Sequence, residues 1–182
     1  MLRRLMAAIL VVLVAGCVSA APTVADPAAD APYRLDSGDR LRVIVFGQQD
    51  LSNSFAVDES GYVTMPLIGS VPARGRTTQE LQATIAVALK NGFLRDPDVS
   101  VEVDQYRPFF IMGEVRTPGQ YVYVNGMTVQ TAVAIAGGFS PRARTDRVEI
   151  TRAIDGKVLK GRLAMNQKVR PGDTLTVMQR LF

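Results

Sequence analysis

Residues 107–139 constrain the fold most, because strand, turn, strand and helix signals follow one another there without interruption. Residues 109–112 form a short apolar run of aromatic, branched and thioether side chains, which predicts a strand. Residues 117–119 (Thr-Pro-Gly) are typical of a tight turn, and residues 121–124 are expected to return as a second strand. Thr128 is expected to cap a short helix that ends at a glycine pair.

The half of the chain before this stretch predicts a small α+β domain. Residues 41–45 and 99–103 alternate apolar and polar side chains, as half-buried strands do. Residues 55–57 and 62–65 flank a turn and are expected to pair as a hairpin. Between these strands, Thr77-x-x-Glu80 fits a capping box at the start of an amphipathic helix.

The last part of the chain predicts one more hairpin. Residues 148–152 and 157–162 flank Asp155 and Gly156, a strong turn signal. The closing run VRPGDTLTV also echoes LDSGDRLRV near the start, since both place a Gly-Asp turn before alternating apolar residues. The echo favours two independent turn and strand units, and leaves open that the first and last strands lie side by side in one sheet.

Several of these runs resemble one known family. GEVRTPGQY followed by GMTVQTAVAIAGGF is similar to the SLBB (soluble-ligand-binding β-grasp) module of bacterial polysaccharide export lipoproteins, and YRLDSGDRLRVIVFGQQDLS, GYVTMPLIG and LRDPDVSVEV resemble the export domain that precedes it. The resemblance covers residues 33–182. It implies an α+β fold, with a polysaccharide export domain at 33–105 and a β-grasp SLBB domain at 106–182.

The N-terminus has the three-part plan of a secretory signal: Arg3 and Arg4, an apolar run, then small residues. Val14-Ala15-Gly16-Cys17 resembles the lipobox of bacterial lipoproteins, which predicts a signal peptide at 1–16, cleavage between Gly16 and Cys17, and a lipid on Cys17. The alternative is an ordinary signal cleaved after Ala20 or Ala21. Residues 17–32, rich in Ala, Pro and Asp, are expected to form a flexible tether.

The residue inventory excludes several kinds of chemistry. The chain has no histidine and one cysteine among 182 residues, which rules out a His-based triad, a His-ligated metal and an internal disulfide. Its basic residues are interspersed with acidic ones, so no nucleic-acid partner is expected. We therefore predict no cofactor, no metal and no catalytic residue.

Carboxylate pairs are the remaining route to catalysis. Asp96 with Asp98, and Asp58 with Glu59, could cleave a glycosidic bond if they flanked a sugar. Both pairs lie in predicted turns, where Asp serves local hydrogen bonding, and this structural role is the favoured interpretation. A glycan hydrolase is accordingly the third-ranked hypothesis.

Two sets of side chains are candidates for glycan or subunit contacts. Tyrosine rings can stack on sugars, or can equally form a core or interface patch. Arginines in one loop can meet an acidic polymer or a neighbouring subunit's carboxylates, or can simply be solvated. The candidates are Tyr106, Tyr121 and Tyr123 in the first set, and Arg142, Arg144 and Arg147 in the second.

The resemblance implies a lipoprotein component of a capsule or exopolysaccharide export machine, anchored in the outer membrane with its body in the periplasm. It implies a homo-oligomeric conduit or docking ring for polysaccharide translocation, working with an inner-membrane polysaccharide co-polymerase that regulates chain length. Larger members continue into further repeats and a pore-lining helix, whereas this sequence stops at Phe182, so a separate outer-membrane channel protein is also expected. The alternative is a stand-alone soluble-glycan-binding lipoprotein without a transport role.

Overall fold

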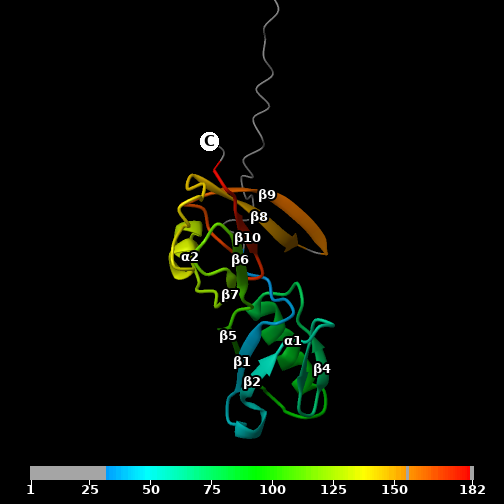
Figure 1. The fold of residues 1–182 in the computed structure, drawn as a ribbon. Coiled ribbons are helices and arrows are strands. Elements are labelled where there is room, and N and C mark those ends of the chain that lie inside the picture. Colours follow the sequence, from blue (N-terminus) through cyan, green and yellow to red (C-terminus); the bar gives the residue numbers. More distant parts are fainter. Residues whose placement is uncertain (1–31, 155, 181–182) are drawn as a thin grey trace, which may run out of the picture.

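The computed structural model describes residues 32–154 and 156–180. Helices and strands are mixed along the chain, which confirms the α+β prediction. Buried apolar side chains form two separate clusters, one from residues 35–101 and one from residues 109–177. Figure 1 shows the corresponding N-terminal and C-terminal lobes placed end to end, with the chain crossing between them near β5 and β6.

The N-terminal lobe packs one helix against two small antiparallel sheets. Strand β1 lies between β2 and β5, while β3 pairs only with β4. Leu81, Ile85 and Leu89 of the helix are fully buried in the core of this lobe. Its elements are β1 (Arg40–Val45), the 3₁₀ helix η1 (Gln49–Leu51), β2 (Asn53–Ala56), β3 (Tyr62–Met65), β4 (Gly69–Pro72), α1 (Thr78–Lys90) and β5 (Val99–Gln105).

The predicted capping box starts α1. The Thr77 side chain accepts from the Glu80 main-chain N–H at 3.1 Å, and the Glu80 carboxylate accepts from the Thr77 N–H at 2.9 Å. Two of the helix's free N–H donors are thereby satisfied. This prediction succeeded because every group in the motif lies within three residues of the others.

The C-terminal lobe is a five-stranded mixed sheet in the order β7-β6-β10-β8-β9, with the β6 and β10 pair parallel. Helix α2 packs on one face of it, where Val129, Ala132 and Val133 share a core with Phe109 and Leu175. The Thr128 side chain caps α2 as predicted. The elements are β6 (Phe109–Gly113), β7 (Gly119–Tyr121), α2 (Val129–Ile135), β8 (Arg147–Ile154), β9 (Lys157–Ala164) and β10 (Thr174–Val177).

The expected hairpin between residues 55–57 and 62–65 is wrong in its pairing. The turn itself forms, since the Gly61 N–H donates to Asp58 O at 3.0 Å. However, β2 is hydrogen-bonded along β1, and β3 leaves that sheet to pair with β4. In the β3/β4 hairpin Val63 lies opposite Val71, and both side chains are buried in the N-terminal core. Burial of this cross-strand pair accounts for the partner that β3 adopts.

The second strand of the central hairpin is shorter than the predicted residues 121–124. Strand β7 ends at Tyr121, which lies opposite Phe109. The residue before Phe109 is Pro108, which has no N–H with which to continue the ladder. Val122 and Val124 lie beyond the strand and are about three-fifths exposed, at 61% and 60%.

The two Gly-Asp units near the chain's ends lie in different sheets. Strand β1 belongs to the N-terminal sheet and β10 to the C-terminal one. The interpretation as two independent turn and strand units is therefore confirmed. Both units nevertheless approach the junction between the lobes.

Candidate functional site

Two turns of the same construction lie at the junction. In the first, residues 36–39, the Asp39 N–H donates to Asp36 O at 3.1 Å, and the Asp36 N–H donates to the Asp39 carboxylate at 2.9 Å. In the second, residues 170–173, the matching distances are 3.1 Å from Asp173 N to Arg170 O and 2.7 Å from Arg170 N to the Asp173 carboxylate. Both aspartates are fully buried. In each turn, the last residue is a buried aspartate that immediately precedes a strand, β1 after Asp39 and β10 after Asp173.

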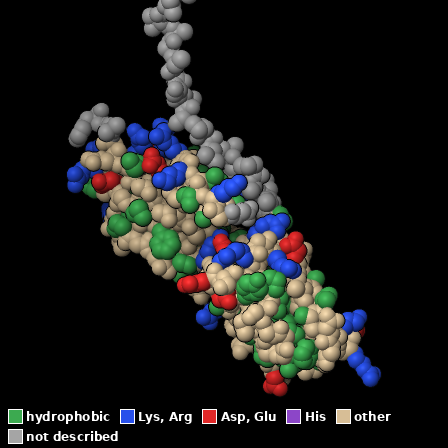
Figure 2. All heavy atoms as spheres, turned by 90° about the vertical axis from the view of Figure 1, so that its right-hand side faces the viewer, with side chains coloured by type: hydrophobic (Ala, Val, Ile, Leu, Met, Phe, Trp, Pro, Cys, Tyr) green, Lys and Arg blue, Asp and Glu red, His purple; other side chains and the backbone are tan. Residues whose placement is uncertain are grey.

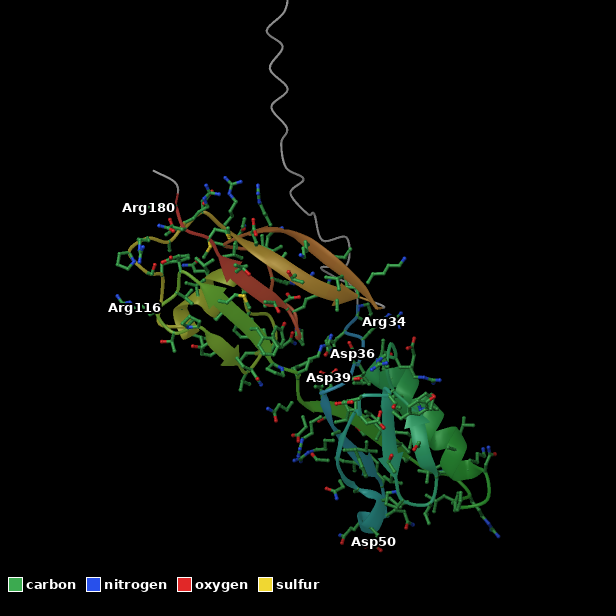
Figure 3. The ribbon with its side chains drawn as sticks, turned by 45° about the vertical axis from the view of Figure 1, so that its right-hand side comes forward. Arg34, Asp36, Asp39, Asp50, Arg116 and Arg180 are labelled. Atoms are coloured by element: carbon green, nitrogen blue, oxygen red, sulfur yellow. The ribbon has the colours of Figure 1, made fainter. Side chains whose placement is uncertain are left out.

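The carboxylate of Asp39 holds the two lobes together. It accepts from the Arg107 main-chain N–H at 2.9 Å and from the Tyr33 hydroxyl at 2.7 Å. The Arg107 guanidinium adds a contact at 3.3 Å to Asp39 and one at 3.6 Å to Asp36. Figure 3 shows Asp36 and Asp39 where the lobes meet. A buried carboxylate with this many donors is a structural clamp.

The carboxylate of Asp173 acts inside the C-terminal lobe. It receives both Nε and Nη2 of Arg152, at 2.7 and 2.8 Å, and the arginine side chain is only 10% exposed. This two-pronged geometry is the strong form of an arginine–carboxylate pair. The pair ties β8 to the turn that starts β10.

Arg107 is enclosed by both turns. A Cβ atom added to Gly38 would lie 3.4 Å from Arg107 Cβ, and one added to Gly172 would lie 2.7 Å from Arg107 Nε. The Gly172 N–H also donates to Pro108 O at 3.0 Å. The short linker between the lobes, residues 106–108, therefore contacts the turn at residues 36–39 on one side and the turn at residues 170–173 on the other.

The three candidate tyrosines pack within the protein. Tyr106 lies edge-on between Tyr33 and Tyr123, at ring-centroid distances of 4.9 and 5.4 Å. Tyr121 stacks on Phe109 and donates its hydroxyl to Thr117 O at 2.6 Å. Burial raises the pKa of the Tyr33, Tyr106 and Tyr123 hydroxyls, and the nearby Asp39 charge raises it further for Tyr33 and Tyr106. Much of each ring is thus engaged by neighbouring side chains.

The three candidate arginines lie together, and a fourth joins them. Residues 142–144 run antiparallel to residues 178–180, through hydrogen bonds from Arg180 N to Arg142 O at 2.9 Å and from Arg144 N to Met178 O at 2.8 Å. Arg144 and Arg147 share the carboxylate of Asp146. Arg180 lies opposite Arg142, a neighbour that sequence reasoning missed because the pairing is long-range.

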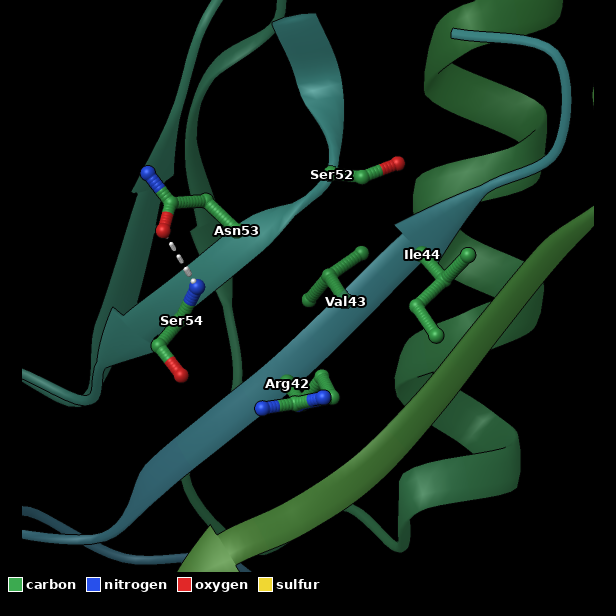
Figure 4. A pocket seen from close by; sticks show the side chains of 6 residues that line it. All are labelled: Arg42, Val43, Ile44, Ser52, Asn53 and Ser54. Carbon is green, nitrogen blue, oxygen red and sulfur yellow. Dashed lines mark hydrogen bonds between the residues drawn. The ribbon is translucent and has the colours of Figure 1, made fainter. Parts of the chain in front are cut away.

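Figure 4 shows one shallow depression, along β1 and β2 of the N-terminal lobe. Its volume is about 320 Å³, and it is wide open to solvent. The Ser52 hydroxyl that lines it is engaged with main-chain groups of Val45 and Gln48. Its other lining residues are Arg42, Val43, Ile44, Asn53 and Ser54, a set without a carboxylate pair.

One of the candidate carboxylates, Asp58, has a local main-chain partner. Asp58 accepts from the Tyr62 N–H at 2.9 Å, the turn role predicted for it. Across residues 32–154 and 156–180, acidic and cysteine side chains form no cluster of three that could hold a metal ion. No helix in the same part of the chain has the length and apolarity needed to span a bilayer. The predicted cleavage and lipidation positions, Gly16 and Cys17, lie outside the described residues.

Two family models match the chain in tandem. Residues 27–104 match a family described as polysaccharide biosynthesis/export protein, and residues 108–160 match the SLBB domain. The two matches meet at the linker that contains Arg107.

Curated relatives extend the similarity. The exopolysaccharide production protein ExoF of Rhizobium meliloti is 42% identical over 118 residues, which cover 58% of this chain and 28% of that protein. The EPS I polysaccharide export outer membrane protein EpsA of Ralstonia solanacearum is 28% identical over 79% of this chain and 45% of its own length. The polysialic acid transport protein KpsD of Escherichia coli is 26% identical over 80% of this chain and 28% of its own length. The chain thus spans less than half the length of each of these relatives.

Proposed function

Since the chain belongs to the polysaccharide export proteins, with an export domain followed by an SLBB domain, we propose that it is a component of a capsule or exopolysaccharide export machine. The observation that carries this proposal is the tandem order of the two matched domains along the chain. We propose that the export domain comprises residues 33–105 and the SLBB domain residues 106–182.

The proposed role is conduction or docking of polymer, without catalysis. The gripped linker at Arg107 supports it, because a fixed angle between lobes lets copies of one chain pack repeatedly in the same way. Head-to-tail packing of this kind would close into a homo-oligomeric ring through which, or onto which, the polymer is delivered.

The proposed location is the outer membrane, with the body in the periplasm. A lipid on Cys17 would anchor the chain, and residues 17–32 would give the body its reach. The proposed partners are the polysaccharide, an inner-membrane co-polymerase that regulates chain length, and a separate outer-membrane channel protein. Relatives named for outer-membrane export and polysialic acid transport support this setting.

The candidate contact residues divide by their surroundings. We propose that Tyr106, Tyr121 and Tyr123 act through the packing of the junction and the SLBB core, where their rings already have partners. Arg142, Arg144 and Arg147 are the better candidates for contact with glycan or with another subunit, because Arg142 and Arg147 are exposed and Arg144 is partly exposed.

The test is the location of polymer in a strain that lacks this chain. Polymer is measured at the cell surface, in the medium and in the periplasm, with wild type and Cys17→Ser as complementing alleles. We expect surface polymer to disappear, to return with wild type and to return poorly with Cys17→Ser. Unchanged surface polymer, with no paralogue expressed, would refute export and favour the stand-alone glycan-binding lipoprotein.

A further inference from the structure

The two lobes carry opposite net charge. Residues 33–105 hold seven Lys and Arg against ten Asp and Glu, whereas residues 106–182 hold twelve against five, a net charge of +7. Figure 2 shows Lys and Arg side chains gathered at the end of the C-terminal lobe far from the other lobe. The net charge of +4 for the whole chain therefore conceals a strongly cationic lobe.

Among the described residues, no helix packs on one face of the C-terminal sheet, which is called here the open sheet face. Helix α2 covers the face that presents Phe109, Ile111 and Leu175. On the opposite face, directly paired residues form two rows across the strands, because side chains of paired residues point the same way. The first row is Gln120, Phe110, Thr174, Thr151 and Lys160, and the second is Met112, Thr176, Glu149 and Arg162.

This open sheet face combines apolar groups and hydroxyl groups. Phe110 and Met112 are 40% and 46% exposed and offer an apolar platform. Thr151, Thr174 and Thr176 are partly exposed and offer hydroxyls. From the ~4.8 Å spacing of strands, the face extends roughly 19 Å from β7 to β9.

An arginine rim borders the open sheet face where β10 ends. In the antiparallel contact between residues 142–144 and 178–180, Ala143 is buried in the core, so Arg142 and Arg144 project on the outer side with the opposed Arg180 and Met178. Arg142 and Arg180 are exposed and have no carboxylate partner among the described residues. Figure 3 shows Arg180 at the outer end of the lobe.

We propose that the open sheet face and its arginine rim form a binding surface for an acidic polysaccharide, with the rim arginines taking carboxylates and the Phe110 and Met112 platform taking the apolar faces of sugar rings. This rests on the proposed export function, and names both the class of polymer and the surface that meets it.

The chemistry favours an acidic glycan over other occupants. Guanidinium groups bind carboxylates in two-pronged pairs, which a neutral polymer cannot offer. Hydroxyls and a flat aromatic platform suit sugar rings, which carry polar edges and apolar faces. An anionic lipid surface would be attracted by the arginines alone, and its binding would not depend on the threonine hydroxyls or on Phe110.

The test is a binding measurement with the purified full-length protein in detergent. The probes are polygalacturonate, which is an acidic glycan, neutral dextran of similar length, and phosphatidylglycerol vesicles. We expect binding to polygalacturonate that weakens with salt, and little binding to dextran. Arg142→Gln with Arg180→Gln should weaken it about tenfold or more, since each arginine would lose a charge-assisted bond.

Three further variants keep the test specific. Lys90→Gln with Arg95→Gln removes the same charge from exposed positions of the N-terminal lobe and should leave the affinity within about twofold. Arg142→Lys with Arg180→Lys should restore only part of the affinity, because lysine keeps the charge and loses the two-pronged geometry. Phe110→Ala should weaken binding several-fold without changing the salt dependence. Circular dichroism confirms that each variant is folded.

Equal losses in the two Gln pairs, or binding to the vesicles with none to polygalacturonate, would overturn the proposal. Absence of acidic-glycan binding in a protein whose deletion still abolishes surface polymer would sink this surface while leaving the export function standing. If binding follows the expected variant pattern but deletion of the protein leaves surface polymer unchanged, the binding surface would stand and the export function would fail.

Discussion

The main-chain N–H of Arg107, the residue that links the lobes, donates at 2.9 Å to the carboxylate of Asp39, which lies 68 residues earlier in the sequence. The same carboxylate accepts from the Tyr33 hydroxyl and the Asp36 N–H. One buried side chain therefore joins the chain's first described turn to the start of its second lobe.

Asp39→Ala should be strongly destabilising. It leaves the N–H groups of Asp36 and Arg107 without their acceptor and Arg107 without its buried counter-charge. We expect a loss of about 3–5 kcal/mol in the free energy of unfolding, measured by urea denaturation. Asp104→Ala is the control, because among the described residues that exposed carboxylate accepts a side-chain hydrogen bond from Ser54 alone. Its loss should cost about 1 kcal/mol or less. Similar losses in both variants would contradict the clamp.

Arg152→Met should cost about 3–5 kcal/mol, because it leaves the Asp173 carboxylate buried with its two-pronged partner removed. Arg162→Met is the matched change on the neighbouring strand, where the ion pair to Glu149 is 3.8 Å long and more than two-fifths exposed on both sides. Exposed pairs contribute roughly 0–1 kcal/mol. Urea denaturation should therefore separate the two variants clearly, and an equal effect would argue against the buried pair.

Gly113→Ala should disrupt the pairing of β6 with β10. Its φ is +85°, and a Cβ there would lie 2.2 Å from the Val177 carbonyl oxygen, which is main chain and cannot rotate away. Gly126→Ala imposes the same kind of backbone strain, at φ +81°, into open space. We expect about 1–2 kcal/mol for Gly126→Ala and clearly more for Gly113→Ala, read as thermal midpoints. Equal midpoints would show that this close approach is absent in solution.

Alkaline pH should unfold the protein partly through Tyr33. Burial, with the Asp39 charge next in importance, raises the pKa of this hydroxyl above its unfolded value near 10. The folded state then keeps a proton that the unfolded chain releases, so this contribution is intact below pH 10 and is lost as pH rises above it. The slope is about 1.4 kcal/mol per pH unit for each such proton. Unfolding free energies of Tyr33→Phe and wild type should run parallel from pH 7 to 9, and wild type should fall more steeply above pH 10; parallel curves throughout would contradict this.

The sequence was sufficient for local elements and for the family. Three local features depend on groups only a few residues apart, so the sequence pattern alone predicted them. They are the capping box of Thr77 and Glu80, the cap at Thr128 and the strand at residues 109–113. The pairing of β3 with β4 could not be predicted in this way, because it depends on which valines can be buried together.

The proposed binding surface could be predicted only in part from the sequence. Arg142, Arg144 and Arg147 lie in one short segment and could be named, but Arg180 joins them through a contact across 36 residues of sequence. The Gly-Asp echo was a visible signal for the two turns, yet nothing in either run indicates that its aspartate is fully buried. Burial is a property of the assembled junction, and only the three-dimensional arrangement reveals it.

The most direct test of the account combines the export function with the arginine rim. Surface and periplasmic polymer are measured in a deletion strain that produces an acidic exopolysaccharide and expresses either Arg142→Gln with Arg180→Gln or the control pair Lys90→Gln with Arg95→Gln, at equal protein levels. The account predicts a several-fold drop in surface polymer and retention in the periplasm for the first pair, and near wild-type export for the second. Full export by both pairs would contradict it.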